Sequence, residues 1–487
     1  MQVHYTTAHY MGASAFVCRG GQDMTKQPPE LAEFRYDLIE DGIGHLIFDM
    51  PGRTMNVFSN RAIHESEAVA DWLKTSGLKG LVVSSGKGTA FCAGADLGEL
   101  AQAYAMIIAA PESQRWRIGR DHFSPIGRAF RKLETAGVPV AFAINGLALG
   151  GGCEFALAGH YRVLADTPAT ALGLPESLVG LLPGGGGTQR LPRLVGIEAA
   201  MPVLLDAARF TPADAVAAGV AHRVVPAGQE IAACVEWIKG NPQPKQPWDR
   251  DDHVLPTQAE VSARLAELRR AREEETGGHY PAITAILDCV EFGMPLAMDA
   301  AVSKEIDIFA DLIKRPEPRD MISSLFLGKQ IWQKQRKADA LPKAYDAIAA
   351  AIRKAWADVA ARFDPQAVES AARWARLTVP IPADGQARPV PAEVLGHHRG
   401  IAATGTWIDA PQGQDQIIAG ALLGAAVVAA LEQGSGLDPD SRRAADFHSI
   451  NAAGFPAYLG GPFALYDSIG SEGVRRLIAP VATETAR

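Results

Sequence analysis

The chain has 487 residues, of which 47% are hydrophobic and 21% are charged, and its formal net charge at pH 7 is −8. This composition is typical of folded, water-soluble domains, and the length predicts two or three of them. The acidic balance argues against general nucleic-acid binding, although a few local cations are enough to bind the phosphates of a small molecule.

The cysteines and the apolar runs indicate the compartment of the protein and whether it spans a membrane. The five cysteines are dispersed and show no C-x-x-C spacing, which favours a reducing compartment over a disulfide framework or a zinc site. The N-terminus lacks a basic segment followed by an apolar one, so we expect no secretory signal and a cytoplasmic location. Residues 417–431 form the longest apolar run. It is shorter than the roughly 20 residues of a membrane span and predicts a buried helix.

The first half of the chain alternates between short apolar strands and amphipathic helices. Residues 1–33 show no sustained periodicity and predict an N-terminal extension, in which Met24 could serve as an alternative start. Residues 34–39 and 43–49 flank Glu40-Asp41-Gly42 as a hairpin. Further strands are predicted at 80–84, 138–145, 161–165 and 220–225, and helices at 60–74, 124–136 and 197–207. The alternation predicts a layered α/β domain over residues 34–240.

The sequence of the second half of the chain predicts helices and no strands. A proline-containing stretch at 241–257 opens a helical segment that extends to residue 378. Its helices are predicted at 258–275, 281–292, 295–312, 319–337 and 342–363. A second proline-rich stretch, around residues 380–391, begins a C-terminal helical region, 379–487. No tandem repeat of fixed period is present.

Three consecutive glycines, Gly150, Gly151 and Gly152, lead directly into a predicted helix with Glu154 in its first turn. Glycines at a helix start leave backbone N–H groups unpaired and approachable, so they can bind an anion or a developing oxyanion. Tight packing of a strand–helix turn is the alternative interpretation of the glycines. For Glu154 the alternative is a favourable interaction with the helix dipole, although its neighbours in sequence are apolar.

Two other segments carry related features. Glu176 follows Leu174-Pro175 in an apolar setting, shortly before the glycine run 184–187. The small residues of segment 86–97, Ala95 among them, expose backbone N–H groups ahead of a helix that begins near Asp96. Each of these segments, taken alone, is typical of structural loops as well as of functional ones.

In combination and in this order, the three segments resemble the crotonase (enoyl-CoA hydratase/isomerase) superfamily over residues 34–228. The resemblance implies a spiral of ββα turns with helices that support oligomerisation. It assigns the two oxyanion-hole N–H groups to Ala95 and Gly151, and the two hydratase glutamates to Glu154 and Glu176. It also implies an acyl-CoA thioester as substrate, and neither a metal nor a redox cofactor.

The later chain resembles the multifunctional β-oxidation proteins, notably at residues 247–250, 280–289, 325–330, 454–463 and 467–470. Those proteins carry a NAD-binding 3-hydroxyacyl-CoA dehydrogenase domain between such segments. Here no strand followed by G-x-G-x-x-G occurs after Gln330, so NAD is not expected. Between the two glutamates this chain is about two residues longer than is usual for the family, and we expect the extra residues in the turn 166–170.

The predicted function is hydration of a trans-2-enoyl-CoA to a 3-hydroxyacyl-CoA in fatty-acid β-oxidation or a related pathway. A Δ3-Δ2-enoyl-CoA isomerase, alone or in combination with the hydratase, is the nearest alternative. A non-catalytic assembly scaffold is an alternative of another class. Arg53 and Lys87 could contact CoA phosphates, although solvated surface charges explain them as well. Expected partners are the acyl-CoA, a second copy of the chain or other β-oxidation enzymes, without nucleic acid or a membrane span.

Overall fold

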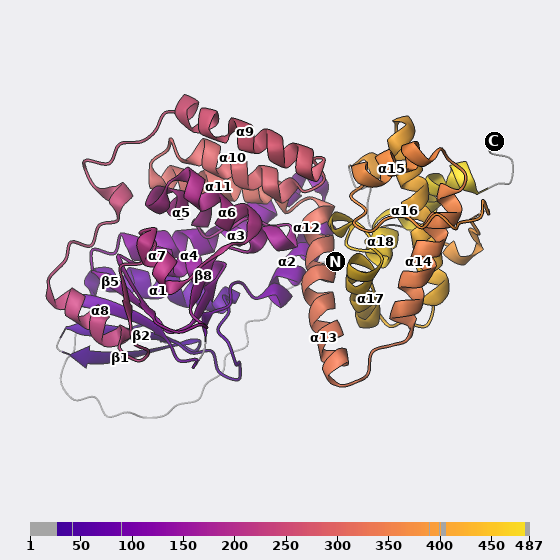
Figure 1. Cartoon of the computed structure of the whole chain (residues 1–487). Helices are drawn as coiled ribbons and strands as arrows, with labels where there is room; N and C mark the ends of the chain where they lie inside the picture. The colour runs from indigo at the N-terminus through magenta and orange to yellow at the C-terminus, as the bar shows by residue number, and fades with distance from the viewer. Residues whose placement is uncertain are drawn as a thin grey trace.

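The computed structural model describes residues 27–40, 42–88, 90–388, 390–398, 400 and 406–482. Most of the predicted extension 1–33, including Met24, lies outside the described residues. Two bodies follow one another along the chain (Figure 1). The first contains both sheets together with the helices that cover them, and the second is built from helices.

A six-stranded sheet has the order β1-β2-β3-β5-β7-β10. Its strands are β1 (Phe34–Glu40), β2 (Ile43–Phe48), β3 (Gly80–Ser85), β5 (Val140–Ile144), β7 (Tyr161–Ala165) and β10 (Arg223–Val225). The predicted hairpin is confirmed, because β1 pairs antiparallel with β2, while the remaining neighbours pair in parallel. The predicted strand 220–225 is wrong at its start. Ala221 N–H donates to the carbonyl of Ala215 in α7 (Pro212–Ala217) instead of to a strand.

A smaller sheet of very short strands has the order β4-β6-β8-β9. Its strands are β4 (Ala90–Cys92), β6 (Leu147–Leu149), β8 (Ala171–Gly173) and β9 (Arg209–Phe210). Along the chain, β3, β5 and β7 of the large sheet are each followed by one strand of the small sheet and then by helical structure. This repeated strand–strand–helix turn confirms the predicted ββα spiral. The turn 166–170 joins β7 to β8.

The helices of the first body cover the sheets and frame the loops between them. They are α1 (Asn60–Ser76), α2 (Leu97–Ala109), α3 (Glu112–Glu134), α4 (Gly151–Leu157), α5 (Gly187–Val195), α6 (Ile197–Asp206) and α8 (Glu230–Lys239). The Ser59 side chain caps α1 by accepting from Ala62 N–H at 3.0 Å. The helix predicted at 124–136 begins much earlier, at Glu112. Pro125 lies inside α3, whose amphipathic pattern continues on both sides of the proline.

Three further helices complete the core of the first body. They are α9 (Gln258–Thr276), α10 (Pro281–Gly293) and α11 (Met298–Leu312), and Figure 1 shows them packed beside α3, α5 and α6. Their buried side chains, such as Leu265, Ile286 and Phe309, belong to the same hydrophobic cluster as the sheet residues Phe48 and Leu164. The first half of the predicted segment 241–378 is therefore part of the α/β body in its packing.

A continuous helical rod leads from the first body to the second. It consists of α12 (Pro316–Met321), the π-helical turns η4 (Ile322–Gly328) and α13 (Lys329–Lys337). The second body has its own hydrophobic cluster and comprises α14 (Ala344–Ala360), α15 (Pro365–Trp374), α16 (Gly413–Gln433), α17 (Pro439–Ala452) and α18 (Pro462–Ile478). By length and composition α16 could cross a membrane, but 78% of its apolar window is buried inside the protein. It is the central core helix that its apolar sequence predicts.

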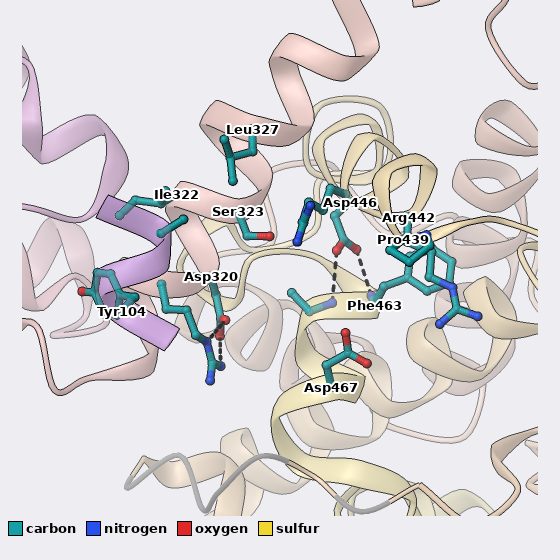
Figure 2. Close-up of a pocket in the computed structure, with 14 residues that line it drawn as sticks. Tyr104, Asp320, Ile322, Ser323, Leu327, Pro439, Arg442, Asp446, Phe463 and Asp467 are labelled. Carbon is teal, nitrogen blue, oxygen red and sulfur yellow. Dashed lines mark hydrogen bonds and ion pairs between the residues drawn. The ribbon is translucent and has the colours of Figure 1, made fainter. Parts of the chain in front are cut away.

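An open cavity of about 1030 Å³ lies where the two bodies meet (Figure 2). Tyr104 of α2 and Asp320 of α12 line one side, and Asp446 of α17 and Phe463 of α18 line the other. Helix α2 therefore faces the second body on this side. On its other side it borders the pocket described next.

Candidate active site

One pocket of about 730 Å³ in the first body is lined by all four residues predicted for the site: Ala95, Gly151, Glu154 and Glu176. They come from three different turns of the spiral: Ala95 follows β4, Gly151 and Glu154 follow β6, and Glu176 follows β8. Apolar side chains form most of the remaining wall, namely Phe58, Ile63, Leu100, Phe123, Ile126, Leu181, Leu182 and Phe309. The pocket thus combines an apolar interior with a few convergent polar groups, the usual character of a small-molecule site.

The backbone N–H groups of Ala95 and Gly151 are both available to a ligand. Phe58 pairs with the two neighbours of Ala95, donating to Gly94 O and accepting from Asp96 N–H, so Ala95 N–H points to the other side. Gly151 is the first residue of α4, and its N–H therefore has no acceptor within the helix. A Cβ on Gly151 would lie 3.9 Å from Ala95 N, which shows that the two segments are adjacent.

Glycine is required at the two positions on either side of Gly151. Gly150 has a φ of 52°, and a Cβ there would lie 2.6 Å from Oε1 of Glu176. A Cβ on Gly152 would lie 2.6 Å from the Cβ of Cys92 on β4. The first glycine gives space to a carboxylate, and the second allows α4 to pack closely on the small sheet.

Glu154 is buried, with a relative exposure of 2%, and the glycine loop 184–187 holds one of its oxygens. The N–H groups of Gly185 and Gly187 each donate to Glu154 Oε1 at 2.7 Å. Burial raises the pKa of Glu154 to about 7, although these two hydrogen bonds and the charge of Arg190 oppose the rise. A carboxylate with this pKa is partly ionised at neutral pH and can accept a proton.

Glu176 is the first residue of the 3-10 helix η2 (Glu176–Val179). Its Oε2 atom is buried and has no hydrogen-bond partner among the described residues. Burial raises the pKa of Glu176 well above its ordinary value, and the nearby charges of Glu154 and Glu305 add to the rise. A raised pKa favours the protonated form of the carboxyl group, and that form can act as a proton donor.

A third carboxylate, Glu305, approaches the glycine loop from α11 and was not among the predicted site residues. It is fully buried and accepts from Gly186 N–H at 2.7 Å, from Thr188 N–H at 3.2 Å and from the Thr188 hydroxyl. The sequence carried one signal of this position. Ala301, Glu305 and Phe309 recur every four residues on the buried face of α11, where a charged residue is exceptional.

A buried ion pair supports the same loop from a third direction. Arg190 Nε lies 2.6 Å from Glu134 Oε1, and both side chains are fully buried. Arg190 Nη1 also donates to the carbonyl of Gly185 at 2.6 Å. Because the guanidinium is fixed by Glu134, it can hold the loop carbonyl in one orientation.

The two predicted phosphate contacts are both engaged in ion pairs. Arg53 Nη2 lies 2.6 Å from Asp96 Oδ2, next to Ala95, and its side chain is half exposed. Lys87 Nζ lies 2.8 Å from Asp49 Oδ1 and also donates to Met50 O. Of the two, only Arg53 pairs with a residue that lines the pocket, Asp96. Its contact with CoA stays a prediction.

Comparison with known proteins gives the same assignment for the first body. Residues 39–243 match the family model described as enoyl-CoA hydratase/isomerase. The "Fatty acid oxidation complex subunit alpha" of Shewanella frigidimarina is 37% identical over 308 residues, 62% of this chain and 42% of that protein. Its counterpart from Shewanella baltica (strain OS155) is 36% identical over 304 residues, with the same coverage. The chain spans about two fifths of the length of these relatives.

Solved structures with similarity to the chain include enoyl-CoA hydratases from Bacillus anthracis and Bacillus halodurans. The first is 24% identical, with a TM-score of 0.39 and coverage of 57% of this chain and 89% of the other. The second is 17% identical, with a TM-score of 0.43 and coverage of 60% and 99%. The family assignment rests on the sequence match and on the ββα spiral with its pocket. Over residues 39–243 the chain therefore forms a domain that belongs to the enoyl-CoA hydratase/isomerase family, the crotonases.

Proposed function

We propose that this protein catalyses the reversible addition of water to a trans-2-enoyl-CoA, which gives a 3-hydroxyacyl-CoA. The observation that carries the proposal is the meeting of two unpaired N–H groups and two buried carboxyl groups in one largely apolar pocket. Hydration needs this combination, because it stabilises negative charge on a thioester oxygen and moves two protons.

The N–H groups of Ala95 and Gly151 bind the thioester carbonyl oxygen in this proposal. As hydroxide adds to C3, electron density moves through C2 onto that oxygen, and the two donors stabilise the enolate-like charge. One such donor is typically worth about 10²–10³ in rate. The apolar wall strengthens the effect, because few other dipoles compete inside the pocket.

Glu154 and Glu176 handle the two protons. Ionised Glu154 takes a proton from water as the water oxygen attacks C3, and protonated Glu176 delivers a proton to C2. The substrate gains one H and one OH, while the two carboxyl groups exchange their protonation states and are reset by proton transfer with solvent. The pKa of Glu154 near 7 and the raised pKa of Glu176 support this division.

A role in fatty-acid oxidation, with acyl-CoA as the small-molecule partner, follows from the same proposal. The naming of the Shewanella relatives as subunits of a fatty acid oxidation complex supports it and favours association with other enzymes of the process. The chemistry requires no redox cofactor, because water addition changes no overall oxidation state, and in this proposal two N–H groups take the part that a metal could play in polarising the carbonyl. The 3-hydroxyacyl-CoA product would pass to a separate oxidising enzyme.

The test is the loss of the conjugated enoyl absorbance when the purified protein is mixed with a short trans-2-enoyl-CoA. Wild type should consume the substrate and yield 3-hydroxyacyl-CoA. Glu154→Gln and Glu176→Gln should each lower kcat by about 10²–10⁴, because each removes one proton-transfer group while the shape is preserved. Glu67→Gln, on α1 away from the pocket, is the matched control and should keep wild-type activity.

Two outcomes would contradict the hydratase. Full activity of Glu154→Gln would exclude the proposed base. Conversion of a 3-enoyl-CoA to the 2-enoyl-CoA without hydration would identify an isomerase, which needs one proton-shuttling carboxylate. No turnover of either substrate would favour the scaffold.

A further inference from the structure

We propose that Glu305 is a positioning residue for the hydration chemistry, acting through the glycine loop on Glu154. The inference rests on the proposed function and extends it to a helix outside the matched family domain, since α11 begins at Met298 and the family match ends at residue 243. The helical segment that follows the catalytic spiral then completes the active site as well as covering it.

The loop 184–187 offers its successive N–H groups alternately to two carboxylates. Gly185 and Gly187 donate to Glu154, whereas Gly186 and Thr188 donate to Glu305. The loop is therefore held between two carboxylates on opposite sides. If the Glu305 side lost its hydrogen bonds, the loop would keep the support of Arg190 at the Gly185 carbonyl, but the N–H groups on the Glu154 side would be held less firmly.

Fixing the loop matters because, among the described residues, only the loop holds the Glu154 carboxylate by hydrogen bonds. Both of these hydrogen bonds reach Oε1, and none from a described residue reaches Oε2. This arrangement leaves Oε2 for the water that must be activated. A shift of the loop would rotate the carboxylate and misdirect Oε2, and misplacement by about 1 Å can cost about 10²-fold in rate.

Glu305 does not line the substrate pocket. A substitution of Glu305 should therefore affect the chemical step and leave substrate binding nearly unchanged. Its three hydrogen bonds are made with the loop and with Thr188 alone. Its burial is complete, which makes these bonds strong, because water does not compete for the same donors. Loss of the carboxylate should therefore change kcat much more than KM.

The experiment compares Glu305→Gln with wild type in two measurements on the full chain. The glutamine side chain keeps the shape and one acceptor oxygen, which can still accept from Gly186 N–H. Its NH₂ group then faces the Thr188 donors and cannot accept from them. Hydrogen exchange of the peptide that covers residues 183–190 should become at least tenfold faster. With a short trans-2-enoyl-CoA, kcat should fall by about 10–100-fold, while KM stays within about twofold.

Ile306→Ala is the matched control, because Ile306 is the buried neighbour of Glu305 on α11 and belongs to the hydrophobic core. It should destabilise the protein without affecting loop exchange or kcat of the folded fraction. If wild type is active, equal kcat for Glu305→Gln and Ile306→Ala would overturn the inference, whatever the exchange shows. If wild type has no hydratase activity, the proposed function fails. Faster loop exchange in Glu305→Gln alone would then still support the positioning contact, and unchanged exchange would refute it.

Discussion

At the scale of single residues, the two oxygens of the Glu154 carboxylate have different surroundings. Oε1 is fixed by two loop N–H groups, whereas Oε2 receives no hydrogen bond from the described part of the chain. Burial raises the pKa of this group to about 7, so a small change of pH changes the fraction that can act as a base. The group combines a fixed position with a pKa suited to neutral pH.

The pH dependence of kcat/KM should show this group directly. Because Glu154 must be ionised to accept a proton, activity should fall about tenfold for each pH unit below about 7, and should level off above it. The measurement is initial hydration rate between pH 5 and 8, with circular dichroism at each pH to verify that the protein stays folded. A profile that is flat down to pH 5 would show that Glu154 is not the base.

The site residues that could be predicted from the sequence are those that lie inside local motifs. Ala95, Gly151, Glu154 and Glu176 each come with glycines, prolines or apolar neighbours that mark a loop or a helix start. Glu305 could not be assigned in this way, because its partner Gly186 lies 119 positions away in the chain. A charged residue on an apolar helix face indicates only that some buried partner exists.

At the scale of elements, local sequence predicts long helices and strands well, but it predicts short ones poorly because distant partners define them. Amphipathic helices such as α1 and α10 were predicted almost to the residue, since their periodicity extends over the whole element. The strands of the small sheet have two or three residues each and show no periodicity. They are defined by tertiary pairing, and the sequence indicates only the loops that contain them.

Helix ends also depend on distant partners, and α18 is an example. Its N-cap position is Gly461, which has no side chain to accept a hydrogen bond. Asp446 on α17 replaces the missing cap, since it accepts from Phe463 N–H at 2.8 Å and from Ala464 N–H at 3.1 Å (Figure 2). A carboxylate from one helix thus satisfies the free donors of the next.

Asp446→Ala should lower the free energy of unfolding of the second body by about 1–2 kcal/mol, because two helix N–H groups lose their acceptor in a buried place. Urea unfolding followed by tryptophan fluorescence measures the change, since Trp332, Trp356, Trp374 and Trp407 lie in or beside this body. Asp440→Ala on the same helix is the control and should cost less than about 0.5 kcal/mol, because Asp440 is exposed. Equal effects of both substitutions would contradict the capping role.

At the scale of the whole molecule, the buried apolar side chains form separate cores in the two bodies. The large cluster of the first body extends from Phe34 to Ile322 and contains the pocket, and a smaller cluster lies between the large sheet and α8. The cluster of the second body extends from Tyr345 to Val481. The rod α12–η4–α13 joins them, and a cavity lies at their contact. Sequence composition predicted a helical second half, but the point where one core ends and the next begins became visible only from the packing.

Two separate cores should unfold in two transitions during calorimetry. A non-hydratable acyl-CoA thioester at about 100 times its Kd should stabilise the transition of the pocket-containing body by about 2.7 kcal/mol and leave the other unchanged. The assignment can be verified with Asp446→Ala, which should lower only the second transition. A single transition that moves as a whole with the ligand would show that the two bodies unfold cooperatively.

The distribution of sulfur gives this architecture a built-in chemical reporter. Every cysteine of the chain precedes residue 290, so the second body contains no thiol. Cys92, Cys153, Cys234 and Cys289 are buried, and burial raises the pKa of Cys92 to about 12 and the pKa values of the other three thiols well above their ordinary value. Thiol reagents attack the thiolate, so these four groups are unreactive in the closed protein. Alkylation at these four cysteines under native conditions, read peptide by peptide so that Cys18 is kept apart, therefore counts the openings of the first body alone.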